Sequence, residues 1–467
     1  METPIPQSGL RKNQEVSCRI DALGAQGEGI CRGLGQVLFV PGALPGEEIR
    51  VRVQKVTKSL AYGKLLEVLK ASLDRTAPPC PHFGCCGGCA MQHMSYQAQL
   101  TAKGQQVQDC LRRIGKLSIQ VSASIGMEHP WRYRNKTALP VQLINGKPHA
   151  GFYAPRSHRL IPITECLIAR PACDAATAAV IRWMREYAVI PYQEESKQGL
   201  VRHIISRVNT RDEVMVTLAI NGGAIPHADA LIQGLKSALP GFHSLHLTHQ
   251  MAGDNVILGE DSHRLYGDRP FIDEACGLRF ELSPLAFFQV NSTISQRMYQ
   301  DAITLAGIRP GDTVVDLYSG AGVITLLASG HCHQAIGIEI APQAVANAKA
   351  NAVLNGINNA AFYEGAAEAL LPRMQAEGLR CDVAFLDPPR KGAHPEVLSA
   401  IAQACPRRII YISCHPASQA RDAALLEEMG YQVVSSQPYD MFCQTAEVEN
   451  LLCFDRIEGG QAHGNSP

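Results

Sequence analysis

The sequence predicts a multidomain fold with three parts: a β-barrel over residues 13–72, an α+β domain over residues 73–270 and a doubly wound α/β domain over residues 271–457. Short apolar runs broken by glycines predict the barrel. Strand-like runs around a helical stretch near residues 172–187 predict the mixed middle part. Regular strand–helix alternation from about residue 309 predicts a largely parallel sheet. The last ten residues, 458–467, are expected to form a disordered tail.

Composition excludes several classes of protein. With 46% hydrophobic and 18% charged residues, the chain has the balance of a folded protein rather than a disordered one. No run reaches the ~18 apolar residues of a membrane span, and the first residues lack the pattern of a signal peptide. We therefore expect a cytoplasmic monomer without membrane contact. In that compartment, 16 cysteines indicate free thiols, metal ligands or catalytic groups.

Any contact with nucleic acid must be local, because the net charge is zero. Two basic clusters could supply it, although a solvated basic face is the simpler interpretation of each. The first contains Arg50, Arg52, Lys55, Lys58, Lys64 and Lys70, and the second combines Arg132, Arg134 and Lys136 with Trp131 and Tyr133. Around the first cluster, the Gly-x-Gly turn, the VPGALPGE corner and the basic strand resemble a TRAM domain, an RNA-binding barrel of the oligonucleotide-binding type.

Three strand ends of the C-terminal part indicate a site for S-adenosylmethionine. Residues 316–322 read DLYSGAG, in which an acid precedes the glycines, as is typical of enzymes that use this cofactor and unlike the dinucleotide fingerprint. Glu339 ends the next strand, where an acid can accept hydrogen bonds from ribose hydroxyls. Asp387, in DPPR, ends a third strand. One glycine turn alone could be an ordinary β–α connection, but three such ends in this order favour the cofactor.

Cys414 ends a further strand of the same sheet, in YISC, and is the candidate nucleophile. C5 of uracil attacks a methyl donor poorly until a thiolate adds at C6, and a base must afterwards remove the C5 proton. Glu447 and Glu449 are the candidate bases, and their spacing predicts that both point the same way. A structural cysteine is the alternative for Cys414.

A second group of cysteines indicates a metal site. Cys80, Cys86 and Cys89 follow the spacing C-x5-C-x2-C, and Cys166 is far away in sequence, as a fourth ligand can be. Thiolates select zinc or iron–sulfur clusters, and the spacing leaves both open. Cys85 is the extra thiol and is interpreted as a neighbour.

Together these motifs resemble the bacterial RNA uracil-5-methyltransferases that carry a TRAM domain and a [4Fe-4S] cluster and modify 23S ribosomal RNA. The resemblance rests on CPHFGxCGGC, FFQVN, DLYSGAG, DPPRKG, YISC and the final VE, in that order, between about residues 13 and 455. It implies a class I methyltransferase domain of the Rossmann-like type. It implies four ligands of the cluster: Cys80, Cys86, Cys89 and Cys166. It implies four contacts with S-adenosylmethionine: Gln289, Tyr318, Glu339 and Asp387. Cys414 would be the nucleophile and Glu449 the proton acceptor.

The chain departs from this family at three positions. Ser319 replaces a frequent Cys, Val323 replaces a polar residue, and Glu447 replaces the usual His, so Glu447 could share the role of base. The cluster is hypothesised to be structural or RNA-positioning, since the reaction transfers no electrons. The alternatives are the same reaction on the T-loop uridine of transfer RNA and a non-catalytic iron–sulfur RNA-binding factor. A radical methylthiotransferase is disfavoured, because its C-x3-C-x2-C triad is absent.

Overall fold

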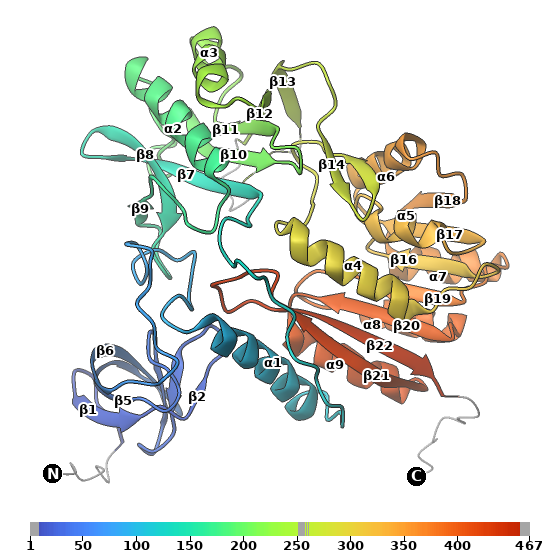
Figure 1. The fold of residues 1–467 in the computed structure, drawn as a ribbon, viewed down its shortest axis with the longest axis horizontal. Helices are drawn as coiled ribbons and strands as arrows, with labels where there is room; N and C mark the ends of the chain where they lie inside the picture. The colour runs from blue at the N-terminus through green and yellow to red at the C-terminus, as the bar shows by residue number, and fades with distance from the viewer. Residues whose placement is uncertain (1–8, 251–256, 258, 260, 458–467) are drawn as a thin grey trace.

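A computed structural model describes residues 9–250, 257, 259 and 261–457, so the predicted tail, 458–467, lies outside the described residues (Figure 1). The N-terminal part forms one sheet of six strands that encloses a small core, in the order β1-β5-β6-β4-β3-β2. Its strands are β1 (Glu15–Arg19), β2 (Ala22–Leu23), β3 (Gly29–Cys31), β4 (Val37–Val40), β5 (Glu48–Val56) and β6 (Leu60–Lys70). In β5, Ile49, Val51 and Val53 are buried while Arg50 and Arg52 face solvent, the alternation of a half-buried strand.

The middle part contains a sheet of seven strands in the order β13-β12-β11-β10-β7-β8-β9. They are β7 (Lys136–Ile144), β8 (Lys147–Tyr153), β9 (Leu160–Pro162), β10 (Val201–Val208), β11 (Val214–Ile220), β12 (Phe242–His249) and β13 (Ser262–Tyr266). Two helices, α2 (Pro171–Glu186) and α3 (Ala228–Ala238), share its core. The sequence predicted only the first of them, because α3 is short and polar turns flank it.

Helix α1 (Tyr96–Arg113) packs on the C-terminal part, although its residues fall in the range expected for the middle domain (Figure 1). Val107 and Leu111 are fully buried in the same core as Leu317 and Leu452 of the C-terminal sheet. Helix α1 therefore lies between the barrel and the C-terminal sheet and contacts the last helix, α9 (Pro416–Glu428).

The C-terminal part is the predicted doubly wound sheet, ordered β18-β17-β16-β19-β20-β22-β21. Its strands are β16 (Thr313–Leu317), β17 (Gln334–Glu339), β18 (Ala360–Glu364), β19 (Val383–Leu386), β20 (Arg408–Ser413), β21 (Tyr431–Tyr439) and β22 (Glu449–Arg456). The other helices are α4 (Ser292–Ala306), α5 (Val323–Ser329), α6 (Pro342–Leu354), α7 (Ala367–Ala376) and α8 (Pro395–Ala404). The chain runs outward from β16 to β18 and then returns to β19. Ligands of such sheets bind where the order reverses, at the carboxyl ends of β16 and β19.

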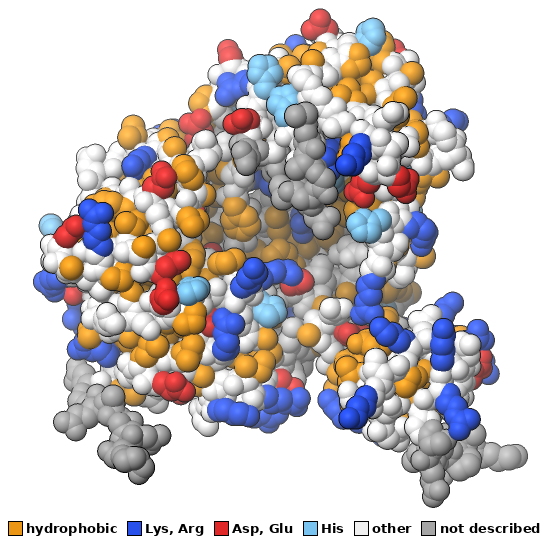
Figure 2. All heavy atoms as spheres, turned by 180° about the vertical axis from the view of Figure 1, so that it is seen from behind, with side chains coloured by type: hydrophobic (Ala, Val, Ile, Leu, Met, Phe, Trp, Pro, Cys, Tyr) orange, Lys and Arg blue, Asp and Glu red, His pale blue; other side chains and the backbone are white. Residues whose placement is uncertain are grey.

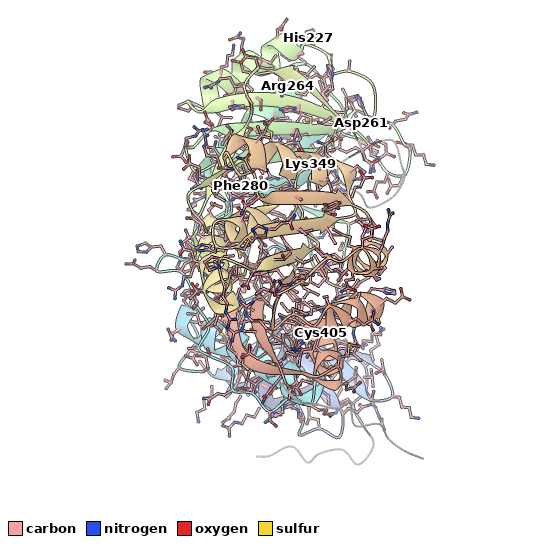
Figure 3. All side chains as sticks on the ribbon, turned by 90° about the vertical axis from the view of Figure 1, so that its right-hand side faces the viewer. His227, Asp261, Arg264, Phe280, Lys349 and Cys405 are labelled. Atoms are coloured by element: carbon pink, nitrogen blue, oxygen red, sulfur yellow. The ribbon has the colours of Figure 1, made fainter. Side chains whose placement is uncertain are left out.

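A hairpin of β14 (Ile272–Ala275) and β15 (Leu278–Glu281) joins the middle part to this sheet. Phe280, labelled in Figure 3, is fully buried and packs against Phe288 with the ring centroids 5.7 Å apart. Phe288 directly precedes Gln289, so this contact helps to fix a residue expected at the cofactor site. Within the described part of the chain, no helix has both the length and the apolar character needed to cross a membrane.

The two basic clusters differ in exposure. All six residues of the first cluster are exposed on the barrel, where Arg50 pairs with Glu67 at 2.7 Å and Arg52 with Glu15 at 2.7 Å. The second cluster is not an exposed surface, because none of its five side chains is exposed and Arg132 forms ion pairs with Glu165 and Asp174. Neither a solvated basic face nor an exposed RNA-binding surface, the two interpretations of this cluster, matches that burial. Figure 2 shows a face hollowed in its middle, with Lys and Arg side chains at the rim.

Candidate active site

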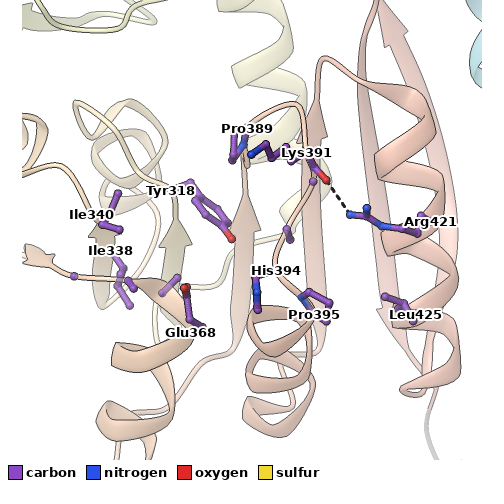
Figure 4. Close-up of a pocket in the computed structure, with 15 residues that line it drawn as sticks. Tyr318, Ile338, Ile340, Glu368, Pro389, Lys391, His394, Pro395, Arg421 and Leu425 are labelled. Carbon is purple, nitrogen blue, oxygen red and sulfur yellow. Dashed lines mark hydrogen bonds between the residues drawn. The ribbon is translucent and has the colours of Figure 1, made fainter. Parts of the chain in front are cut away.

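A cavity of about 510 Å³ opens at the carboxyl ends of the C-terminal strands, where the sequence predicted the cofactor (Figure 4). Tyr318, Ile338 and Gly365 line it from the ends of β16, β17 and β18. Pro389 and His394 line it from the segment after β19. Tyr318 has a φ of 65° and follows β16 directly, so the chain turns sharply there and the phenol lies in the cavity wall.

The glycine turn after β16 is held by the acid at the end of β17. Glu339 accepts hydrogen bonds from the backbone N–H of Gly320 at 3.0 Å and from that of Ala341 at 2.9 Å. Its neighbours Ile338 and Ile340 line the cavity, whereas Glu339 itself does not. The carboxylate therefore shapes the turn, and its remaining lone pairs are available to a hydroxyl group.

Two residues of the DLYSGAG motif are structural. Asp316 is buried and accepts hydrogen bonds from the backbone N–H of Thr325 at 3.0 Å and from its hydroxyl at 2.6 Å. Burial raises the pKa of Asp316 to about 7, although the hydrogen bonds from Thr325 lower it. Gly322 has a φ of 85°, and a Cβ atom there would lie 2.9 Å from the ring of Phe362. The motif thus requires an acid and a glycine for the turn itself, independent of any ligand.

Cys414 directly follows β20 and is partly buried. Burial and the carboxylate of Glu449 raise the pKa of its thiol to about 11, and Asp387 and Glu447 act in the same direction. The guanidinium of Arg390 opposes them. The thiol thus lies among carboxylates with a cation beside it.

Arg390 is a site residue that the sequence analysis did not single out, although it ends the DPPR motif. It forms an ion pair with Glu447 at 2.8 Å. Burial lowers the pKa of Arg390, but Glu447 and Cys414 together outweigh burial, so that the pKa is raised. The positive charge is therefore shared between the Cys414 thiol and a neighbouring carboxylate.

The two candidate bases differ in burial, whereas the charges of both act on Cys414, and their common direction stays a prediction. Glu447 lies in the connection before β22, is partly exposed and pairs with Arg390. Glu449 is the first residue of β22 and only 4% exposed. Burial, followed by the charge of Asp387, raises the pKa of Glu449 well above its ordinary value. In its ionised form, a carboxylate with a raised pKa is a stronger proton acceptor than an ordinary one.

Gln289, Tyr299 and Asp387 complete the group around Glu449. Gln289 is 5% exposed, and burial raises the pKa of Asp387 to about 7. Burial raises the pKa of Tyr299 well above its ordinary value, and the charges of Asp387 and Glu449 add smaller contributions. A hydrogen bond between Tyr299 and Gln289 lowers the pKa and so opposes this change. The sequence contains no signal for Tyr299, whose position in α4 only the fold brings to this site.

The four cysteines of the predicted metal site lie around one small cavity. Cys80, Cys86, Cys89 and Cys166 line a volume of about 170 Å³, whereas Cys85 is exposed and does not line it. Burial raises the pKa of Cys89 to about 12, and the other three thiols add to the shift. Among the described residues, no three His, Cys, Asp or Glu side chains form a group that could hold a single metal ion.

Comparisons with known proteins identify the family. Residues 95–457 match the family described as tRNA (Uracil-5-)-methyltransferase, and residues 10–66 match the TRAM domain. An uncharacterized RNA methyltransferase of Halalkalibacterium halodurans is 40% identical over 451 residues, covering 96% of this chain and 98% of the relative. An uncharacterized RNA methyltransferase of Clostridium tetani is 38% identical over 453 residues, covering 97% and 98% of the two chains.

One solved structure shares the fold over nearly the whole chain. The tRNA (uracil-54, C5)-methyltransferase of Pyrococcus abyssi, crystallised with S-adenosyl-L-homocysteine, superposes with a TM-score of 0.77 at 22% identity. The match covers 94% of this chain and 100% of that one. The expected TRAM domain and methyltransferase fold are thereby confirmed. By its sequence matches, this chain belongs to the S-adenosylmethionine-dependent RNA uracil-5-methyltransferase family with an N-terminal TRAM domain.

Proposed function

We propose that this protein methylates C5 of a uridine in 23S ribosomal RNA, with Cys414 as the nucleophile and Glu449 as the proton acceptor. One observation carries the proposal: Cys414 follows β20 beside the Arg390–Glu447 pair, and its thiol interacts with the buried Glu449 and Asp387. A thiol, a cation and a buried base in one place are the groups that addition at C6 and proton removal from C5 require.

The proposed mechanism assigns one role to each of these residues. The Cys414 thiolate adds to C6 of the uracil, and electron density moves to C5 and the O4 carbonyl oxygen. S-adenosylmethionine would supply an electrophilic methyl group, which C5 takes up, and S-adenosylhomocysteine would be left as the neutral thioether. Glu449 then removes the proton from C5, the C6–S bond breaks, and 5-methyluridine leaves with the thiolate regenerated. Arg390 stabilises the thiolate before addition and after release.

The cofactor is assigned to the cavity at the carboxyl ends of β16 to β19. Tyr318 would offer a wall for the adenine, and Glu339, which holds the glycine turn, would accept hydrogen bonds from the ribose. Gln289 and Asp387 do not line this cavity and would contact the cofactor on the side of the substrate base. The support is the cavity, the glycine turn and the place of both at the point where the strand order reverses.

Each of three regions would have its own role. Residues 13–72 would bind RNA, residues 73–270 would contain the cysteine site, and residues 271–457 would transfer the methyl group. A groove of about 710 Å³ between the barrel and α1 supports a path for RNA, because Phe39 and Arg32 line it and it reaches Ala446, next to Glu447. An aromatic ring can stack on a base, and an arginine can contact a phosphate.

The four thiols around one cavity fit an iron–sulfur cluster. A [4Fe-4S] cluster is larger than one ion, so its four thiolates stand farther apart than those of a zinc site, in keeping with a cavity between Cys80, Cys86, Cys89 and Cys166. The cluster would tie residues 80–89 to Cys166. It would supply no electrons, since none is transferred in the reaction.

The experiment that tests the function uses purified protein, labelled S-adenosylmethionine and, separately, unmodified 23S ribosomal RNA and transfer RNA. We expect 5-methyluridine in the ribosomal RNA, identified by mass spectrometry of nucleosides. The Cys414→Ala variant, assayed beside the wild type, should give none. No methylated uridine in either RNA would contradict the proposal.

The second candidate is the same reaction on transfer RNA. It is favoured by the names of the matched family and of the Pyrococcus abyssi enzyme, both of which refer to transfer RNA. The resemblance to enzymes with both a TRAM barrel and the cysteine set favours ribosomal RNA. 5-Methyluridine found only in transfer RNA would keep the mechanism and replace the substrate.

A further inference from the structure

The connection between β21 and β22, residues 440–448, is largely buried although it has no regular structure. Tyr439 and Glu449 are paired in the sheet, so the chain leaves and re-enters it at neighbouring positions. In between, Asp440 and Cys443 are fully buried and Gln444 is 2% exposed. Connections usually run over the surface, because buried backbone needs partners. In Figure 1 this connection, drawn in red, reaches from the sheet towards the start of α1.

Lys103 of α1 is the first partner of the connection. Its side chain is 1% exposed, and its ammonium group donates a hydrogen bond to Asp440 Oδ1 and another, at 3.1 Å, to the carbonyl oxygen of Phe442. A lysine is almost never fully buried unless it is paired. The ammonium group of Lys103 therefore holds the connection at two residues, Asp440 and Phe442.

Gln444 is the second anchoring point. Gln99, one turn before Lys103 in α1, donates a hydrogen bond to Gln444 Oε1 at 3.0 Å. The backbone N–H groups of Ala90 and Met91 both donate to the Gln444 carbonyl oxygen at 3.0 Å. Ala90 directly follows Cys89. The connection is thus held by α1 on one side and by the cysteine segment on the other.

The far end of the connection carries groups of the candidate active site. Thr445 Oγ1 accepts a hydrogen bond from the N–H of Glu447 at 3.3 Å, Glu447 pairs with Arg390, and Glu449 follows two residues later. A buried ion pair adds little net stability over a well-packed apolar pair, and in some proteins its role is to specify one geometry. The Lys103–Asp440 pair is suited to fixing where Glu447 and Glu449 lie.

We propose that Lys103 is a positioning residue of the methyltransferase, which holds the 440–448 connection so that Glu447 meets Arg390 and Glu449 meets the substrate. The inference rests on the proposed function. In this proposal, α1 lies outside the cofactor cavity but controls where the proton acceptor, Glu449, is placed. Lys103 itself is buried and does not line the cofactor cavity.

Three variants and a control test the proposal in the full-length protein. Lys103→Met leaves Asp440 unpaired, the double variant Lys103→Met/Asp440→Leu removes both charges and keeps the interior apolar, and Lys103→Arg retains the cation. Arg112→Met removes a positive charge from the same helix at a site that is 61% exposed. The measurements are the thermal midpoint, kcat and KM for S-adenosylmethionine, and hydrogen exchange of peptides covering residues 440–448.

We expect the double variant to unfold near the wild-type temperature. Its kcat should fall about tenfold or more, while its KM for S-adenosylmethionine stays within roughly twofold of the wild type. The reason is that a small misplacement of the reacting groups slows the reaction without weakening cofactor binding. Exchange should rise in 440–448 and not at the cofactor cavity. Lys103→Arg should recover part of kcat, and Arg112→Met should match the wild type. A double variant with wild-type kcat and exchange would overturn the proposal. A wild-type protein without 5-methyluridine product would instead refute the proposed function.

Discussion

The alkylation rate of Cys414 should change in opposite directions when its two charged neighbours are replaced. Burial and nearby carboxylates raise the pKa of the thiol to about 11, and Arg390 opposes them. Arg390→Met removes that cation, so the pKa of Cys414 should rise further. Glu447→Gln removes a negative charge and releases Arg390 from its 2.8 Å ion pair, so the pKa should fall.

The size of the effect follows from the exposure of Arg390. Two unit charges 4 Å apart interact by about 1 kcal/mol in water and about 4 kcal/mol in a partly desolvated site. Since 62% of the Arg390 side chain is exposed, the lower figure applies after screening by solvent. About 1 kcal/mol corresponds to roughly 0.7 of a pKa unit, or a roughly fivefold change in the thiolate fraction.

The assay is labelling by iodoacetamide at pH 8 without RNA, followed by mass spectrometry of the peptide that contains Cys414. At this pH, below the thiol pKa, the rate is proportional to the thiolate fraction. The exposed Cys405 serves as the internal reference. Labelling should be roughly fivefold slower in Arg390→Met and faster in Glu447→Gln. Equal rates in the two variants, or faster labelling of Arg390→Met, would refute this account of the site.

Three further outcomes are expected. Glu449→Gln should trap a methylated covalent adduct that migrates slowly on a denaturing gel, because the C5 proton then has no acceptor; free product at the wild-type rate would assign the base elsewhere. Burial raises the pKa of Asp387 to about 7, so this group costs stability progressively as the pH rises from its unfolded-state pKa, about 4, and the full cost is present above pH 7. Asp387→Asn should therefore raise the thermal midpoint at pH 8 and lose this advantage towards pH 4, where both proteins are neutral at this position; a gain that grows towards acid pH would argue against it. Cys86→Ser should reduce bound iron and sulfide, measured chemically in protein purified without oxygen, whereas the exposed Cys85→Ser should retain them, and equal contents would exclude Cys86 as a ligand.

Much of the fold could be predicted because its signals are local. Alternation in β5 separates Ile49 and Val51 from Arg50 and Arg52, and this pattern is visible within nine residues. The cofactor motifs lie at strand ends for a similarly local reason, since a parallel sheet gathers all its carboxyl ends at one edge. Cys414 and Asp387 were placed at that edge from the order of strands alone.

The solvent exposure of individual side chains could not be predicted in the same way. The basic residues near Trp131 form a pattern typical of an RNA-binding surface, yet Arg132 is tied to Glu165 and Asp174 and the cluster is not exposed. Glu447 and Glu449 differ in burial because one lies in a connection and the other begins a strand of the sheet. Burial depends on what packs above a residue, and a short pattern does not contain that information.

The sequence by itself determined the barrel, the doubly wound sheet and the motifs that place this chain among RNA uracil-5-methyltransferases, because propensity, periodicity and turn residues act over a few positions. Only the tertiary structure decided that α1 packs on the C-terminal sheet and that Lys103 meets Asp440, 337 residues away. It also decided that Tyr299 joins Gln289 near Glu449. Contacts of this kind depend on how separate elements pack around a shared core, and that packing has no period along the chain.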